Sequence, residues 1–416
     1  MMTNRPRGTN DILPGDVEKW QFIEKTAREV CRRFNTAEVR TPVFEHTELF
    51  ARGVGETTDI VEKEMYTFQD RGERSLTLRP EGTASAVRAF VESKLYAQPQ
   101  QPTKLFYIGP MFRYERPQSG RYRQFHQFGV EVLGASDPSV DAEVIALAMT
   151  FFTELGLNDI TLEINSVGSP ESRTNYRDVL RSHLHPVKEE LCADCQSRYD
   201  RNPMRILDCK VDKCKTLTQG APEMLDHLTD TDREHFQAVC SYLESFGINY
   251  TVNPRMVRGL DYYTQTAFEF IENGSTLSGG GRYNGLVEQL GGPEMPGIGF
   301  AVGIERALIA LQNQQVELPI AKGIDVFFVA LGEAAQQHSV KLLHEMRVAG
   351  IVADKDYLGK SMKAQMKAAD RLSARQVVIL GDDELAQGVA NVKDMETGEQ
   401  ITVPLAELIE KVQSNM

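Results

Sequence analysis

Hydrophobic and polar positions change their spacing several times along this chain, and each change marks a predicted element. Residues 17–34 place apolar side chains at steps of three and four, which predicts an amphipathic helix, and 38–44 follow as a predicted strand. Apolar positions alternate over 106–112 and again over 124–132, and Pro, Ser and Gly at 117–120 supply a turn between them. The chain therefore contains a long predicted hairpin with a charged connecting turn.

The composition of the chain divides it into four stretches. From 169 to 247 the pattern is charged and helical, and prolines interrupt it. Strand patterns resume afterwards, so we interpret 169–247 as an insertion that separates two parts of one larger domain, 1–168 and 248–320. A linker that contains a proline then precedes the last stretch, 321–416. We expect this last stretch to form a domain of its own.

The last stretch alternates short apolar runs with helical patterns. Apolar runs at 324–331, 351–354 and 376–380 are separated by predicted helices at 335–348 and 361–372. Strands that alternate with helices in this way pair in parallel, so we predict an α/β domain with a mostly parallel sheet, closed by a hairpin.

The charged turn of the predicted hairpin changes this picture, because the whole chain is acidic. From Lys104 to His126 there are five Lys or Arg against one Glu, whereas the formal net charge of the chain is -13. A solvated, salt-bridged turn would explain such a run. Phe125 and His126 are interleaved with the arginines, however, which favours a site where a base stacks on an aromatic ring and phosphates meet guanidinium groups.

Four stretches of the chain resemble one family. Residues 112–127 closely resemble motif 2 of class II aminoacyl-tRNA synthetases in its histidyl form, and 256–264 resemble the histidine-specific signature of the histidyl-tRNA synthetases. Residues 297–306 are similar to motif 3, and 7–14 have the N-terminal pattern of the family. The helix and strand over 17–44 resemble motif 1, which builds the dimer interface in class II enzymes.

The resemblance implies both a fold and an activity. The fold is an α+β catalytic domain built on an antiparallel sheet, with a helical insertion, plus a C-terminal α/β anticodon-binding domain. The activity is that of a histidine–tRNA ligase, which activates L-histidine with ATP and Mg²⁺ to histidyl-adenylate and pyrophosphate. It then transfers histidine to the 3'-terminal adenosine of its cognate tRNA. We also expect a homodimer and no organic cofactor.

The resemblance also carries residue roles onto matching positions. The catalytic positions are Arg113, Arg258 and Arg306. The positions for histidine are Glu81, Gly82, Thr83, Arg113, Gln127, Glu131, Arg258 and one or both of Tyr262 and Tyr263. The positions for ATP are Arg113, Glu115, Arg121, Phe125 and Arg306. The positions for the tRNA acceptor end are Arg116, Gln118 and Arg123.

Two other functions compete with this one. A catalytically idle paralogue that senses histidine as a regulatory subunit shares the catalytic core, but such paralogues tend to lose the signature, the motif arginines and the C-terminal domain. A class II synthetase for another amino acid is opposed by the signature from Arg258 to Tyr263. The sequence departs from the family at Asn284, where the family usually has Asp. A phosphate loop at Gly359 is excluded, because the glycine that a Walker motif needs is replaced by Asp354.

Four of the six cysteines fall close together in the insertion, as Cys192, Cys195, Cys209 and Cys214. Two Cys pairs can supply four thiolates to a structural zinc ion. The second pair is more widely spaced than the first, and the resemblance implies no metal that the fold requires. We therefore expect reduced thiols and no metal.

Membrane and export signals are not expected in this chain. It has no apolar run of about 18 residues, and its first ten residues lack the apolar core of a signal peptide. We expect a cytoplasmic protein.

Overall fold

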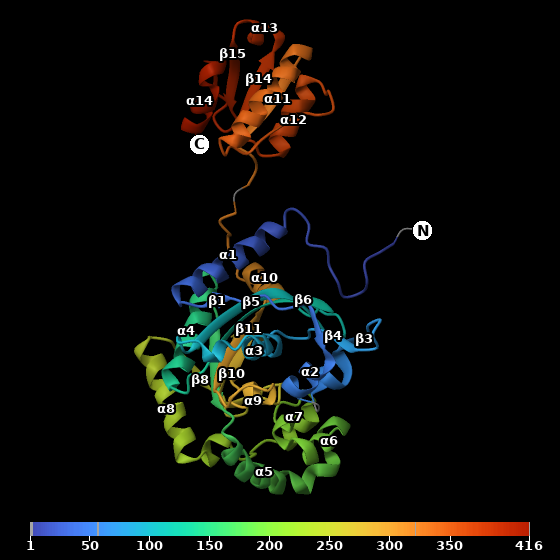
Figure 1. The fold of residues 1–416 in the computed structure, drawn as a ribbon, viewed down its shortest axis with the longest axis vertical. Coiled ribbons are helices and arrows are strands. Elements are labelled where there is room, and N and C mark those ends of the chain that lie inside the picture. The colour runs from blue at the N-terminus through green and yellow to red at the C-terminus, as the bar shows by residue number, and fades with distance from the viewer. Residues whose placement is uncertain (1–2, 56–57, 321, 416) are drawn as a thin grey trace. The chain divides into compact units, whose positions relative to one another are not determined.

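The computed structural model describes residues 3–55, 58–320 and 322–415, and the chain forms two compact units, Met1–Leu318 and Pro319–Met416 (Figure 1). The first unit is built on an eight-stranded sheet. In spatial order its strands are β1 (Ala37–Glu38), β5 (Thr103–Phe112), β6 (Gln124–Leu133), β11 (Gly297–Gly303), β10 (Ser275–Arg282), β9 (Thr264–Glu272), β7 (Thr161–Ser166) and β8 (Thr251–Val252). Neighbours are antiparallel except for the two outermost pairs, β1 with β5 and β7 with β8.

The two faces of this sheet bury different kinds of residue. On β6, Phe128, Val130 and Val132 belong to a large apolar core. Four long helices complete this core: α1 (Val17–Arg33), α4 (Pro138–Glu154), α8 (Asp230–Ser245) and α10 (Ile304–Asn313). Because side chains alternate along a strand, Gln127 and Glu131 face the opposite side. Burial of the apolar side chains on the core face therefore determines that Gln127 and Glu131 point to the other face.

The central strands carry small residues on that second face. On β11, Ile298, Phe300 and Val302 join the large core, whereas the alternate positions are glycine or alanine. Helix α3 (Thr83–Glu92) and the short α9 (Leu286–Gln289) belong to a second apolar cluster on this side. The missing side chains leave space above the middle of the sheet.

The single strand predicted for 38–44 is wrong. The structure divides this stretch between β1, which pairs with β5, and β2 (Phe44–His46), which joins a separate three-stranded sheet with β4 (Ser75–Leu78) and β3 (Tyr66–Gln69). Pro42 has no amide hydrogen to donate to a strand partner. Arg79 follows β4 directly and donates hydrogen bonds to the carbonyl of Thr41 at 3.0 Å and to that of Pro110, on β5, at 2.8 Å. It therefore links the small sheet to the large one.

The stretch after β7 is helical, as its composition predicted. It contains α5 (Pro170–Leu184), η3 (His185–Glu190), α6 (Ala193–Arg201), η4 (Pro203–Ile206), α7 (Asp212–Leu217) and η5 (Met224–His227), and it leads into α8. The remaining elements of the first unit are α2 (Thr47–Val54), the π-helical turn η1 (Ile60–Glu64) and η2 (Leu95–Ala97). The insertion packs on the same apolar cluster as α3 and α9.

The second unit has a five-stranded sheet in the order β13 (Ala353–Lys355), β12 (Val326–Leu331), β14 (Gln376–Gly381), β15 (Val389–Asp394) and β16 (Gln400–Pro404). The first three strands are parallel, which confirms the prediction from their alternation with helices, and the last two form the predicted hairpin. Its helices are α11 (Glu333–Val348), α12 (Met362–Arg371), α13 (Asp382–Ala386), η6 (Leu405–Glu407) and α14 (Leu408–Ser414). Throughout the described ranges, no helix is long and apolar enough to cross a membrane.

Candidate active site

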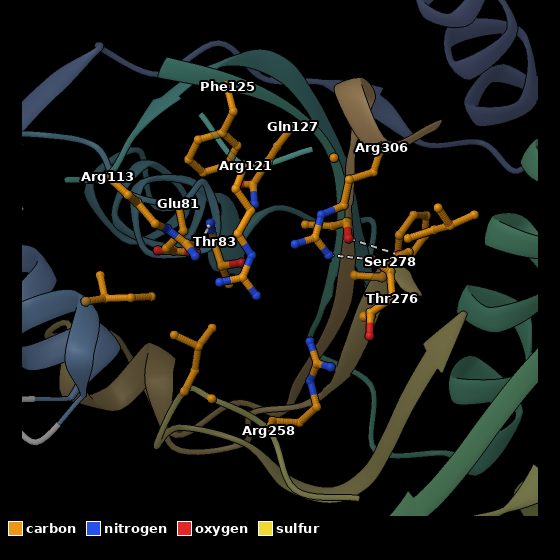
Figure 2. Close-up of a pocket in the computed structure, with 18 of the residues that line it drawn as sticks. Glu81, Thr83, Arg113, Arg121, Phe125, Gln127, Arg258, Thr276, Ser278 and Arg306 are labelled. Atoms are coloured by element: carbon orange, nitrogen blue, oxygen red, sulfur yellow. Dashed lines mark hydrogen bonds between the residues drawn. The ribbon is translucent and has the colours of Figure 1, made fainter. Parts of the chain in front are cut away.

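A cavity of about 390 Å³ lies on the second face of the large sheet. Most of the residues singled out in the sequence line it, although they come from distant parts of the chain. They are Glu81, Thr83, Arg113, Glu115, Arg121, Phe125, Gln127, Glu131, Arg258, Tyr262, Tyr263 and Arg306. Figure 2 draws 18 of the lining residues and labels ten of them, of which eight belong to this set and two are Thr276 and Ser278.

Four guanidinium groups surround the open space of the cavity. Those of Arg113, Arg121, Arg258 and Arg306 project toward one another from different sides (Figure 2). Burial, and then the charge of Arg121, lower the pKa of Arg306 below its ordinary value. Such mutual repulsion is unfavourable unless an anion is bound, so the cavity is suited to a ligand with several negative charges.

Neutral groups and one carboxylate hold Arg113 in place. Its Nε donates to the carbonyl of Pro80 at 2.8 Å, and its guanidinium carbon lies 5.3 Å from the centre of the Phe125 ring. Glu115 lies between two arginines, with one carboxylate oxygen 3.3 Å from Arg121 and the other 3.8 Å from Arg113. The hairpin loop thus places a flat aromatic ring, a carboxylate and two guanidinium groups together.

Arg306 and Arg258 approach from the strand side of the cavity. Nη1 of Arg306 donates to the carbonyl of Thr276 at 2.5 Å (Figure 2). Arg258 forms an ion pair with Glu269 and lies over the ring of Tyr263. It passes directly above Gly279, where a Cβ would be 2.2 Å from its Nη2. The glycine therefore provides the space that this guanidinium occupies.

A buried carboxyl group forms the floor of the cavity. Glu131 is 1% exposed and accepts hydrogen bonds from the hydroxyls of Tyr283 at 2.5 Å and Tyr107 at 3.2 Å. Burial raises its pKa to about 8, although the hydrogen bond from Tyr283 acts in the opposite direction. A Cβ at Gly299 would lie 2.0 Å from its Oε2, so this position also needs a glycine.

Polar groups at the start of α3 complete this end of the cavity. Glu81 accepts hydrogen bonds from the backbone amides of Thr83 at 2.7 Å and Ala84 at 2.8 Å, which orients its carboxylate. Across from it, the Oε1 atom of Gln127 is buried and has no hydrogen-bond partner among the residues that the structure describes. An unpaired buried acceptor and an oriented carboxylate that line one cavity are well suited to a ligand that donates hydrogen bonds, such as an ammonium group.

Four predicted site residues do not line the cavity. Arg116 and Gln118 lie exposed in the hairpin loop. Arg123 stacks over Tyr114 at 3.9 Å, and its amide donates to the carbonyl of Gly8 at 2.7 Å. Gly82 packs against Tyr107, since a Cβ there would lie 2.1 Å from the tyrosine ring.

Several residues that line the cavity or support its side chains were not predicted from the sequence. Tyr107 and Tyr283 hold Glu131, Glu269 pairs with Arg258, and the insertion contributes Arg205 to the lining. Tyr107 belongs to the alternating pattern of β5, and Tyr283 follows the three glycines of β10, so both carried a positional signal. Nothing in the local sequence of Arg205 distinguished it from the other charged residues of the insertion.

Comparisons with known proteins match this chain along almost its whole length. The family model described as histidyl-tRNA synthetase matches residues 8–307, and the anticodon binding domain model matches 325–415. The histidine–tRNA ligase of Bacillus subtilis strain 168 is 58% identical over 99% of both chains. That of Halalkalibacterium halodurans is 59% identical over 97% of this chain and 96% of its own.

A solved structure shows the same fold. The apo histidyl-tRNA synthetase of Staphylococcus aureus matches with a TM-score of 0.86 and 48% identity, covering 99% of this chain and 100% of that one. The fold expected from the sequence is confirmed: a class II catalytic domain on an antiparallel sheet, followed by an anticodon-binding domain. This chain belongs to the histidyl-tRNA synthetase family.

Proposed function

We propose that this chain is a histidine–tRNA ligase that activates L-histidine with ATP and transfers it to its cognate tRNA. One observation carries the proposal: Arg113, Arg258 and Arg306 converge on one cavity beside the buried Glu131. The positive charges of the arginines suit a triphosphate. The buried carboxyl group of Glu131, together with the lining hydroxyls of Tyr262 and Tyr263, suits a small polar ring. The two relatives described above, which are 58% and 59% identical to this chain, are also named histidine–tRNA ligases.

ATP occupies the part of the cavity next to the hairpin loop. The adenine stacks on Phe125, and its amino group donates to Glu115. Arg113 contacts the α-phosphate, Arg258 lies on the other side of that phosphate, and Arg306 contacts the γ-phosphate. Arg121 belongs to the same loop and adds a fourth positive charge. Mg²⁺ would enter with ATP as part of the substrate and would offset negative charge on the phosphates.

In the first step, a carboxylate oxygen of histidine attacks the α-phosphorus of ATP. The bond from that phosphorus to the bridging oxygen breaks, and pyrophosphate leaves with the electron pair. Negative charge grows on the phosphoryl oxygens during this step, so guanidinium groups that are already in place stabilise the transition state. Loss of one such contact is expected to cost about 3 kcal/mol.

The other end of the cavity distinguishes histidine from other amino acids. Its imidazole has one donor and one acceptor when neutral. We assign Glu131 to the donor and a hydroxyl of Tyr262 or Tyr263 to the acceptor. Glu81 and Thr83 bind the α-amino group together with the unpaired Oε1 of Gln127. A site that pairs both ring nitrogens should disfavour an apolar ring by roughly four orders of magnitude.

In the second step, a hydroxyl of the terminal ribose of the tRNA attacks the histidyl carbonyl carbon and loses its proton. The bond from that carbon to the phosphate oxygen breaks, and AMP leaves with the electron pair. Arg116, Gln118 and Arg123 belong to the hairpin loop that also supplies Glu115 and Arg121 to the cavity, and we assign them to the acceptor end. We assign 1–168 and 248–320 to the catalytic domain, 169–247 to the insertion and 321–416 to anticodon binding. The site of action is then the cytoplasm, where tRNA is charged.

A homodimer is part of this proposal. Phe44 and Phe68 lie in edge contact on the three-stranded sheet, with ring centres 6.4 Å apart, and their side chains are 51% and 44% exposed. Val43 next to them is 39% exposed. Contiguous exposed apolar side chains indicate an interaction surface. Val43 and Phe44 end the stretch that resembles motif 1, and Phe68 lies next to them on β3.

ATP–pyrophosphate exchange with each of the standard amino acids tests the proposed function. Histidine alone should support exchange, and the product should then charge histidine tRNA. A histidine-sensing regulatory subunit would bind histidine without exchange, and a synthetase of another specificity would respond to a different amino acid. The regulatory alternative is not favoured, because the histidine–tRNA ligases cited above match both domains of the chain.

A further inference from the structure

The four cysteines of the insertion come together in space. Their Sγ atoms all lie within 4.8 Å of one another, although they belong to different elements. Cys192 precedes α6, Cys195 is in the first turn of that helix, Cys209 follows η4, and Cys214 is in α7. The geometry points to a tetrahedral site for one Zn²⁺ ion, bound by these four thiolates.

The distances between the sulfur atoms fit this metal. A Zn–S bond of about 2.3 Å places the corners of a tetrahedron roughly 3.8 Å apart. Sγ of Cys192 and Sγ of Cys209 are 3.9 Å apart, and the remaining pairs lie within the 4.8 Å limit. A disulfide needs a sulfur separation of about 2.0 Å, so all four cysteines are free thiols at this separation.

The surroundings of the sulfur atoms also fit a thiolate site. Cys195, Cys209 and Cys214 are buried, and the backbone amide of Cys192 donates a hydrogen bond to Sγ of Cys214 at 3.2 Å. Between residues 192 and 215 there are six Lys or Arg against four Asp. A zinc ion with four thiolates has a net charge of -2, which this excess of positive charge offsets.

The short helices of this region have little other support. Helix α6 buries only Cys195 and Tyr199, and the six-residue α7 buries only Cys214. Isolated helices of such length are not stable in water. A metal ion that joins both helices to η4 would supply the missing stability, as structural zinc does in other small units.

The proposed metal site supports a residue of the active-site cavity. Arg205 belongs to η4, between the two cysteine pairs, and it lines the cavity. It pairs with Asp59 at 3.4 Å, and Arg198 of α6 pairs with the same carboxylate at 3.3 Å. Zinc would therefore fix the part of the insertion that contacts the catalytic domain. The spacing of the cysteines alone favoured reduced thiols without a metal, because spacing does not show whether two pairs meet.

Metal analysis of the full chain, purified under reducing conditions without chelators, tests this inference. One zinc per chain is expected by elemental analysis, and native mass spectrometry should show the chain with a single bound zinc ion. Replacement of zinc by Co²⁺ should give the intense near-ultraviolet and visible bands of tetrahedral cobalt thiolate. Cys209→Ser should lose the metal, Cys214→His should keep it with shifted cobalt bands, and Cys240→Ser, outside the cluster, should match the unaltered chain.

Other results would overturn the inference. The inference is wrong if the purified chain contains no zinc and takes up none after reduction. It is also wrong if the chain contains iron in place of zinc, or if Cys209→Ser and the unaltered chain contain equal amounts of zinc. The metal content of the unaltered chain decides the question even if a variant does not fold. Because metal content is measured apart from activity, this test is independent of the proposed ligase function.

Discussion

Tyr283 donates a hydrogen bond of 2.5 Å to Oε2 of Glu131, although the two residues are 152 positions apart in the sequence. The bond crosses from the residue after β10 to β6, over the intervening β11. It is possible only because position 299 on β11 is a glycine. The arrangement holds a carboxyl group in a buried place where its ionisation is unfavourable.

The raised pKa of Glu131 predicts how stability depends on pH. From its ordinary value of 4.5 up to about 8, the folded chain holds a proton that the unfolded chain has lost. The free energy of unfolding should therefore fall as pH rises through this window. Glu131→Gln has no carboxyl group at this position and lacks this contribution. Denaturant unfolding measured across the window should therefore show a smaller fall in the free energy of unfolding for this variant than for the unaltered chain.

Glu81, whose pKa is also raised by burial, is unchanged in that variant, so the difference between the two proteins isolates Glu131. Tyr283→Phe is the matched control. It removes a hydrogen-bond donor that favours the ionised form of Glu131, so the pKa of Glu131 should rise further. The fall in the free energy of unfolding should therefore extend to higher pH. Identical pH profiles for all three proteins would show that Glu131 is ionised throughout.

Many residues of this site could be predicted from the sequence, because they belong to short motifs and to strands with a regular alternation of polar and apolar positions. The alternation of β6 was sufficient to place Gln127 and Glu131 on one face. It could not name Tyr283 as a partner, because that contact depends on the order of strands in the sheet. The predicted strand at 38–44 failed for a similar reason: local alternation does not show that its two ends pair in different sheets.

Arg258→His should abolish most adenylate formation without unfolding the protein. The shorter ring cannot reach the position of the guanidinium, and the lost contact of about 3 kcal/mol corresponds to roughly a 10²-fold slower exchange. Pyrophosphate exchange at saturating histidine and ATP measures this, and circular dichroism checks the fold. Glu269→Gln removes the partner and keeps the guanidinium, so its effect should be smaller. Near-normal exchange in Arg258→His would remove this residue from the mechanism.

Phe125→Ala should weaken the binding of ATP more than that of histidine. Stacking on the adenine is worth about 1 kcal/mol, so the KM for ATP should rise roughly fivefold. The ring also lies 5.3 Å from the guanidinium of Arg113, and its loss leaves that group less well oriented. Phe125→Tyr keeps an aromatic face and should stay close to the unaltered enzyme. If the KM for ATP is unchanged in Phe125→Ala, the stacking assignment is wrong.

Gly279→Ala should lower activity through Arg258. The added methyl group would lie 2.2 Å from Nη2, so the guanidinium must leave its position and its ion pair with Glu269. Exchange should fall at least tenfold, by roughly 1.4 kcal/mol or more in the transition state. Gly285→Ala is the control, because the nearest atom to a Cβ there is 3.9 Å away and its φ of −96° is ordinary. Equal rates for both variants would contradict a fixed position for Arg258.

Phe44→Asp should convert the proposed dimer to monomers. The side chain of Phe44 is half exposed beside Phe68, and a charge at the centre of an apolar interface has to be desolvated without a partner. Light scattering after gel filtration should give twice the chain mass of 46.7 kDa for the unaltered protein and the single mass for the variant. Val348→Asp is a suitable control, since Val348 is 75% exposed at the end of α11 and does not belong to the stretch that resembles motif 1. A monomeric unaltered protein, or a variant that stays dimeric, would move the interface to another surface.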